Sequence, residues 1–208
     1  MNEARGMPDK ALPHGHDHMV RRLEAFSDIV IAFSLSELAF SLHVPSSASD
    51  LLTHPNGYLA FAASFAVVCS IWWLHNRLFA NFFVADTLSI VLNFALLAAI
   101  VMVTFALQLF FRFEGEPIVV AAYALSLGLM YGLIAILYAK GLRDERLTVS
   151  DELRREATRR TRRTGVVAVV LLGSLFAYRL GSQTMEYCWL AMLPAIAALR
   201  IAERNWSA

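Results

Sequence analysis

The polar residues best placed for chemistry lie in one otherwise apolar stretch near the start of this 208-residue chain. A charge near the middle of a bilayer costs at least about 2.5 kcal/mol, so such side chains rarely face lipid. Polar groups inside an apolar helix therefore indicate either a path for a polar species or a contact between helices. Those between residues 22 and 43 include Ser27, Asp28, Ser34, Ser36, Glu37 and Ser41.

Helical phase, at about 100° per residue, sorts this stretch into two stripes with a period of seven. Ile29 and Ser36 lie on the far side of the phenylalanine stripe, Glu37 falls between the stripes, and Asp28 points away from both. The arrangement suits the wall of a pathway or a tight helix interface. The serine stripe is Ser27, Ser34 and Ser41, and the phenylalanine stripe is Phe26, Phe33 and Phe40.

Each stripe has a structural alternative. Serines at helical spacing also let membrane helices pack closely and hydrogen-bond, so their pattern alone favours packing. Glu37 is a functional candidate, because carboxylates inside membranes usually serve function. Its alternative is a buried ion pair with Arg112 or Arg179 from the outer ends of other spans.

Other reactive patterns are sparse. His14, His16 and His18 form a cluster that could bind a metal, but residues 1–20 read as a disordered cytoplasmic tail without fixed geometry. The sequence has no H-E-x-x-H or G-x-S-x-G motif, so we expect no enzyme activity and no cofactor or metal. Cys69 and Cys188 lie in apolar segments and predict no disulfide.

The composition predicts an all-α integral membrane protein, because 58% of residues are apolar and only 17% are charged. A helix needs about 20 residues to cross the hydrocarbon core. Residues 21–208 form one predicted transmembrane domain with six such segments. They are roughly Arg22–His43, Gly57–Phe82, Thr87–Phe111, Pro117–Ala139, Thr164–Leu180 and Glu186–Ala202.

The basic residues fix the expected orientation. With a cytoplasmic N-terminus, 16 of the 18 lysines and arginines fall inside and only Arg112 and Arg179 outside. We therefore expect a multi-pass protein of the cell (inner) membrane with both termini cytoplasmic.

A basic run precedes the fifth span. Residues 143–163 predict a cytoplasmic helical extension, in which Ser150 caps a helix that begins with Asp151 and Glu152. Its arginines favour anionic lipid headgroups as partners rather than nucleic acid.

Two motifs resemble those of a known family. Arg22, Phe26, Ser27 and Asp28 make R-x-x-x-F-S-D at the start of the first span, and Trp72 opens W-x-x-H-x-x-L-F at the end of the second. These patterns resemble prokaryotic members of the lysosomal-type potassium channel family, six-helix proteins without the usual potassium-channel filter. Further matches are His75 within the second motif, Asn93 in the third span and Val44-Pro45 after the first.

The resemblance implies a homotetramer in which the first helix of each subunit lines a central pore. Potassium would be the permeant ion. The narrowest apolar constriction would be Phe33, Ser36 would supply the hydroxyl tied to potassium preference, and Phe40 would add a second apolar layer. An interhelical hydrogen-bond network would hold the motif, formed by Arg22, Ser27, Asp28, His75 and Asn93.

The chain departs from the family pattern in the conduction path. Ile29 replaces the usual glycine, Glu37 is an extra carboxylate, and Ser41 stands where an acid is expected. The resemblance therefore supports the architecture of the family for this chain more strongly than it supports potassium selectivity. A proton-conducting or proton-coupled transporter that uses Glu37 remains the alternative.

Overall fold

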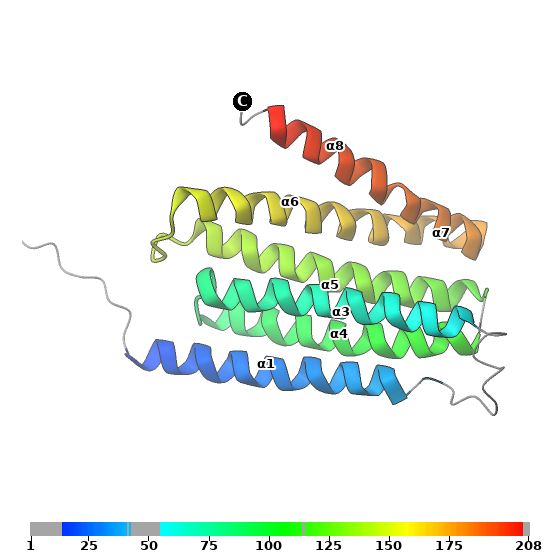
Figure 1. Ribbon diagram of the computed structural model, residues 1–208, viewed down its shortest axis with the longest axis horizontal. Coiled ribbons are helices and arrows are strands. Elements are labelled where there is room, and N and C mark those ends of the chain that lie inside the picture. Colours follow the sequence, from blue (N-terminus) through cyan, green and yellow to red (C-terminus); the bar gives the residue numbers. More distant parts are fainter. Residues whose placement is uncertain (1–13, 41, 43–54, 114, 206–208) are drawn as a thin grey trace, which may run out of the picture.

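The chain forms a bundle of long helices that lie side by side along one axis (Figure 1). The computed structural model describes residues 14–40, 42, 55–113 and 115–205. Val44-Pro45, Ser41 and residues 1–13 lie outside the described residues. The elements are α1 His14–Phe40, α3 Pro55–Asn81, α4 Thr87–Arg112, α5 Pro117–Arg143, α6 Asp151–Ser174, the 3-10 helix η1 Leu175–Leu180, α7 Ser182–Leu190 and α8 Met192–Asn205.

Each of the six expected spans coincides with a helix or with consecutive helices. Among the described residues, four stretches are long and apolar enough to cross a membrane: Thr87–Phe110, Pro117–Arg143, Asp151–Leu180 and Ser182–Ala202. Helix α1 is of similar length, but it carries Glu24, Asp28 and Glu37. It also begins at His14, so part of the tail expected to be disordered is helical.

Two boundaries differ from the expectation for local reasons. Helix α6 begins at Asp151, with Ser150 accepting a hydrogen bond from the Leu153 amide at 3.3 Å, and residues 144–150 are not helical. The last span is interrupted at Ala191. Pro194 has no amide hydrogen to donate to the Leu190 carbonyl, which accounts for the interruption.

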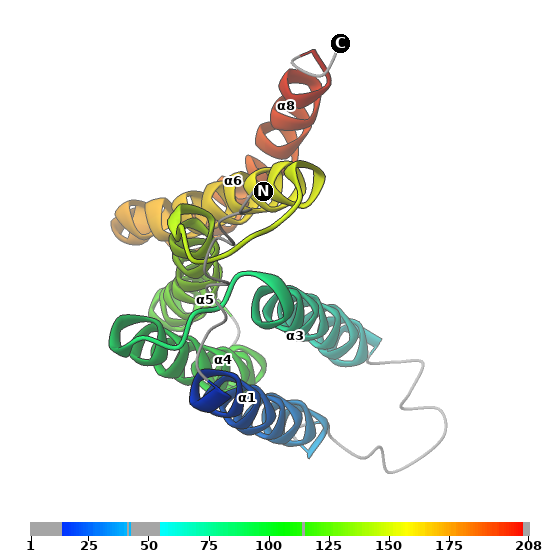
Figure 2. The same cartoon turned by 90° about the vertical axis from the view of Figure 1, so that its left-hand side faces the viewer.

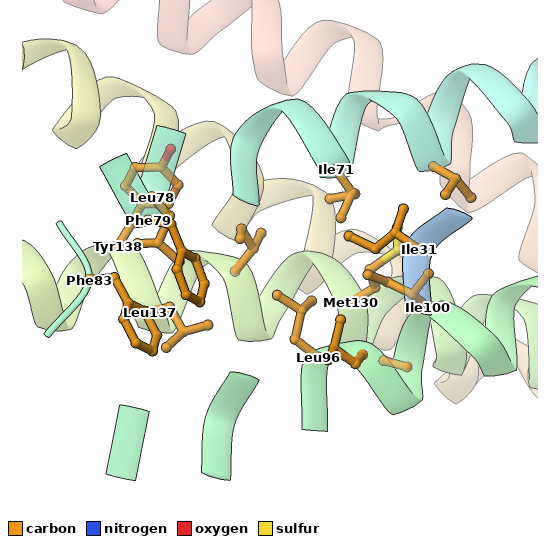
Figure 3. Close-up of a cluster of buried hydrophobic side chains, with 14 of the residues drawn as sticks. Ile31, Ile71, Leu78, Phe79, Phe83, Leu96, Ile100, Met130, Leu137 and Tyr138 are labelled. Atoms are coloured by element: carbon orange, nitrogen blue, oxygen red, sulfur yellow. The ribbon is translucent and has the colours of Figure 1, made fainter. Parts of the chain in front are cut away.

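Helices α1, α4, α5 and α6 form a row, and α3 stands to one side of it (Figure 2). The most extensive packing joins α5 to α6 and α5 to α4. The apolar core runs between α1, α3, α4 and α5. Residues that Figure 3 shows in it include Ile31, Ile71, Leu96, Ile100 and Met130.

Three tyrosines of α5 reach across to α3. The Tyr138 hydroxyl donates to the Leu74 carbonyl at 2.8 Å. Tyr123 and Tyr131 lie close to Ser64 and Ser70 of α3. These long side chains bridge a helix pair whose backbones make few close contacts.

The α3–α4 corner is fastened to the end of α5 by charge. Asp86 caps α4 by accepting from the Ser89 amide at 2.9 Å, and it also pairs with Lys140. Although burial raises the pKa of Asp86, the hydrogen bonds from Lys140 and Ser89 outweigh it and hold that pKa below its ordinary value. A hydrogen bond from Arg146 lowers the pKa of Asp144, at the end of α5, to about 2.

Gly141 permits this corner to form. A Cβ atom there would lie 2.2 Å from the Phe82 carbonyl oxygen, whereas one at Gly165 in α6 would meet nothing within 4 Å. We expect Gly141→Ala to destabilise the protein by about 1–3 kcal/mol, because overpacking forces the backbone to move. Gly165→Ala is the control and should melt at or slightly above the wild-type temperature in detergent. Equal melting of the two variants would contradict this account.

Candidate functional site

Helix α1 has a buried face that packs on α3 and α4. Its members recur every three or four residues, as one face of a helix requires. Ser27 and Ser34 donate to the carbonyls of Leu23 and Val30 at 2.8 and 3.0 Å, so these two serines serve packing rather than a pathway. The buried residues are Leu23, Ser27, Ile31, Ser34 and Leu38.

The opposite face of α1 is uncovered by the rest of the subunit. Phe33 is 73% exposed, Phe40 87% and Ile29 57%, although all three are large apolar side chains. Ser36 is also exposed and donates to the Ala32 carbonyl at 3.0 Å. The structure therefore collects the expected pathway residues on one free surface.

Glu37 belongs to this exposed face as well. Within the described part of the chain it forms no ion pair with Arg112 or Arg179, which are themselves exposed. The Arg112 guanidinium lies instead over the Phe113 ring, 5.7 Å from its centroid. The alternative of a buried ion pair is thus wrong for the subunit.

A chain of buried hydrogen bonds ties α3, α4 and α1 together. His75 Nε2 lies 2.9 Å from Asn93 Oδ1, and Asn93 Nδ2 donates to Ser27 Oγ at 3.0 Å. Ser27 in turn donates to the Leu23 carbonyl. The direction of these bonds makes Nε2 the protonated nitrogen of His75, because Asn93 Oδ1 is only an acceptor.

The surroundings of His75 Nδ1 support the same tautomer. Nδ1 is buried and, among the described residues, has no hydrogen-bond partner. A protonated Nδ1 would leave a donor unsatisfied, which is costly in an apolar interior. The His75 ring also stacks on Phe79 with a centroid distance of 4.4 Å, and that contact holds its orientation.

The remaining motif residues lie around this chain. Asp28 accepts a hydrogen bond from the Trp72 indole at 2.9 Å, a second link between α1 and α3. Phe26 meets Phe94 of α4 edge to face at 6.0 Å. Arg22 is exposed and does not join the Ser27–Asn93–His75 chain, contrary to the network expected from the family resemblance.

Sequence reasoning missed the tyrosine contacts described above. Tyr123, Tyr131 and Tyr138 recur at intervals of eight and seven, which places them on one face of α5. That spacing was a usable signal. For the histidine cluster, the described residues contain no group of three or more His, Cys, Asp or Glu that could hold a metal ion.

Part of the chain is similar in sequence to a known family of channels. Residues 22–103 match the sequence profile of the family described as the endosomal/lysosomal potassium channel TMEM175. A potassium channel of Marivirga tractuosa is 30% identical over 95 residues, which are 46% of this chain and 38% of that protein. The match thus spans well under half of that relative's length.

Solved structures share the fold over nearly the whole chain. The potassium channel MtTMEM175, solved as a variant with a nanobody fusion protein, superposes with a TM-score of 0.66 at 17% identity and covers 100% of this chain and 98% of its own. A lysosomal potassium-selective channel TMEM175 homologue from Chamaesiphon minutus gives 0.66 at 21% identity, over 89% and 98%.

The buried chain predicts a large effect of removing its central member. We expect Asn93→Leu to destabilise the protein by about 1–3 kcal/mol, because it strands the polar atoms of His75 and Ser27. The matched change Asn76→Leu, at a half-buried site on α3 outside the chain, should shift the melting temperature less. Thermal unfolding in detergent measures both, and an equal shift would refute the assigned role.

Proposed function

We propose that this chain, whose residues 22–103 match the TMEM175 family and whose fold is that of solved TMEM175 channels, forms a passive cation channel that prefers potassium. The observation that carries the proposal is the uncovered face of α1. Phe33 and Phe40 share this face with the polar Ser36 and Glu37, and a charged side chain inside a membrane rarely faces lipid. A surface of both kinds suits a pore that alternates apolar layers with polar ones.

In the proposed assembly four subunits surround one axis and present this face of α1 to it. Phe33 forms the narrowest layer, Ile29 lies one turn before it, and Phe40 lies two turns beyond. Apolar constrictions of this kind can stop conduction by dewetting. The Ser36 hydroxyl lies between the phenylalanine layers, where it can contact a partly dehydrated potassium ion.

The motif residues take a different part in the proposal. They hold α1 in place and do not touch the ion, because Ser27 and Asp28 direct their side chains to α4 and α3. His75 and Asn93 complete the same support. Arg22, Phe26 and Trp72 flank it at the basic end of the helix.

We infer the orientation of the protein in the membrane from its basic residues. The α3–α4 corner and the α5–α6 connection meet at one end of the bundle, where Asp86 contacts both Lys140 and Arg146. We assign this basic end to the cytoplasmic face of the cell membrane, near anionic headgroups. Both termini then lie on the cytoplasmic side.

Glu37 supports a second candidate function. Its exposed carboxylate shares the face of Phe33 and Phe40, so it lies where it could attract cations or accept protons on a conduction path. Proton conduction through Glu37 is therefore the alternative to potassium conduction.

Flux into liposomes should respond to the phenylalanine constriction. With a potassium gradient, Phe33→Ala should raise flux by roughly tenfold, as a loss of about 1.4 kcal/mol from the barrier would produce. Phe176→Ala is the matched control, because Phe176 is 94% exposed but lies on η1. Absence of cation flux from both wild type and Phe33→Ala would exclude the channel.

The same liposomes separate the two candidate functions. Glu37→Gln removes the carboxylate and keeps its shape. If potassium is the permeant ion, the variant should keep potassium flux within roughly tenfold of wild type, because attraction by a solvated charge is modest. Proton flux in wild type, abolished by Glu37→Gln under a proton gradient, would instead establish the alternative.

A further inference from the structure

Two adjoining cavities open between α3 and α6, far from the exposed face of α1. One of about 210 Å³ is also lined by Tyr138 of α5, and the other, of about 300 Å³, reaches along α3 to Leu74. They share Glu156 and Arg160 in their walls. Figure 2 shows α3 and α6 as separate helices on the two sides of α5, and the ion pair of Arg77 with Glu156 links them.

The walls of these cavities are strongly basic. Four arginines and one glutamate line them, which leaves three net positive charges. Glu156 Oε1 accepts from Arg77 at 2.9 Å and from Arg160 at 2.5 Å, so this carboxylate orients two of the guanidinium groups. The arginines are Arg77, Arg159, Arg160 and Arg163.

Arg163 lies beside the middle part of α3, which its place in the sequence did not indicate. The segment up to Arg163 was expected to extend beyond the membrane spans. In the structure, Arg163 shares a cavity with Leu74 of α3, seven residues before the end of that helix at Asn81. At 1.5 Å per residue this is about 10 Å inside the end of α3.

A tryptophan lies next to one of the cavity arginines. The Arg77 guanidinium lies 5.3 Å from the centroid of the Trp73 ring, and Trp73 is 53% exposed. Tryptophan is enriched where headgroups meet the apolar core of a bilayer. The Arg77 guanidinium, which lines one cavity, therefore also contacts an exposed aromatic ring of the kind found at membrane interfaces.

We propose that these cavities form a binding site for the phosphate of an anionic phospholipid headgroup. Guanidinium groups match phosphate oxygens with paired N–H donors, and basic pockets between membrane helices commonly hold such headgroups. The proposed site involves only some arginines of the basic run. Arg155 and Arg162 of the same run are exposed and do not line the cavities.

A bound phosphate would join two helices that the protein links only sparsely. Among the described residues, the ion pair of Arg77 with Glu156 is the one salt bridge between α3 and α6. Helix α6 packs mainly on α5. The lipid therefore acts as a bridge between the outer helices and α3, which also carries Trp72 and His75.

The test compares two double variants that lose equal charge from α6. Arg159→Gln with Arg163→Gln removes two of the four arginines that line the cavities. Arg155→Gln with Arg162→Gln is the matched control. Purified full-length protein in neutral detergent is titrated with phosphatidylglycerol, phosphatidylcholine or inorganic phosphate, and bound molecules are counted by native mass spectrometry. Melting temperature checks the fold, and Arg159→Lys with Arg163→Lys supplies a variant that keeps the charge.

We expect wild type and the control pair to bind phosphatidylglycerol alike, and the cavity pair to bind at least roughly tenfold more weakly. The lysine pair should fall between them, because it keeps charge but loses the fork. Inorganic phosphate binding with the same arginine dependence would assign the site to a soluble phosphate. Equal loss in both double variants, or binding by neither probe, would overturn the proposal. The assay measures no conduction, so its result is independent of the proposed channel.

Discussion

Polar groups inside this bundle depend on partners within the protein, because the surrounding hydrocarbon offers none. The chain from His75 Nε2 through Asn93 to Ser27 supplies such partners across three helices, while among the described residues Nδ1 of His75 has none. Tyr138 of α5 supplies a partner for α3. Its hydroxyl donates to the Leu74 carbonyl between two helices whose backbones make few close contacts, so long side chains rather than close backbone packing join α5 to α3.

Helix α1 has two faces with different surroundings. Residues that can be satisfied inside the subunit turn inward, and Ser27 and Ser34 do so through hydrogen bonds to their own helix and to α4. What remains outward is a face that a single subunit leaves uncovered, with Phe33 and Phe40 on it.

Local and periodic features could be predicted from the sequence. The phase of α1 separated Phe33 from Ser27, and the Ser150 cap followed from residue types alone. Features that depend on contacts between distant segments could not be predicted. The Asp28–Trp72 bond joins residues 44 apart, and the depth of Arg163 beside Leu74 depends on how α6 slides along α5. The exposure of Arg22 likewise follows from where α1 docks, which no local pattern encodes.

The interruption at Ala191 has a mechanical consequence for the last span. Helix α7 is anchored to α6 because Trp189 donates to Ser174 at 3.0 Å, whereas α8 diverges from the bundle (Figure 1). Only 6% of the Ser182–Ala202 segment is buried. Bilayers of different thickness are matched by helix tilt, and a missing backbone hydrogen bond lowers the cost of bending. A bend at Ala191 would therefore change the tilt of α8 while the bond from Trp189 to Ser174 keeps α7 on α6.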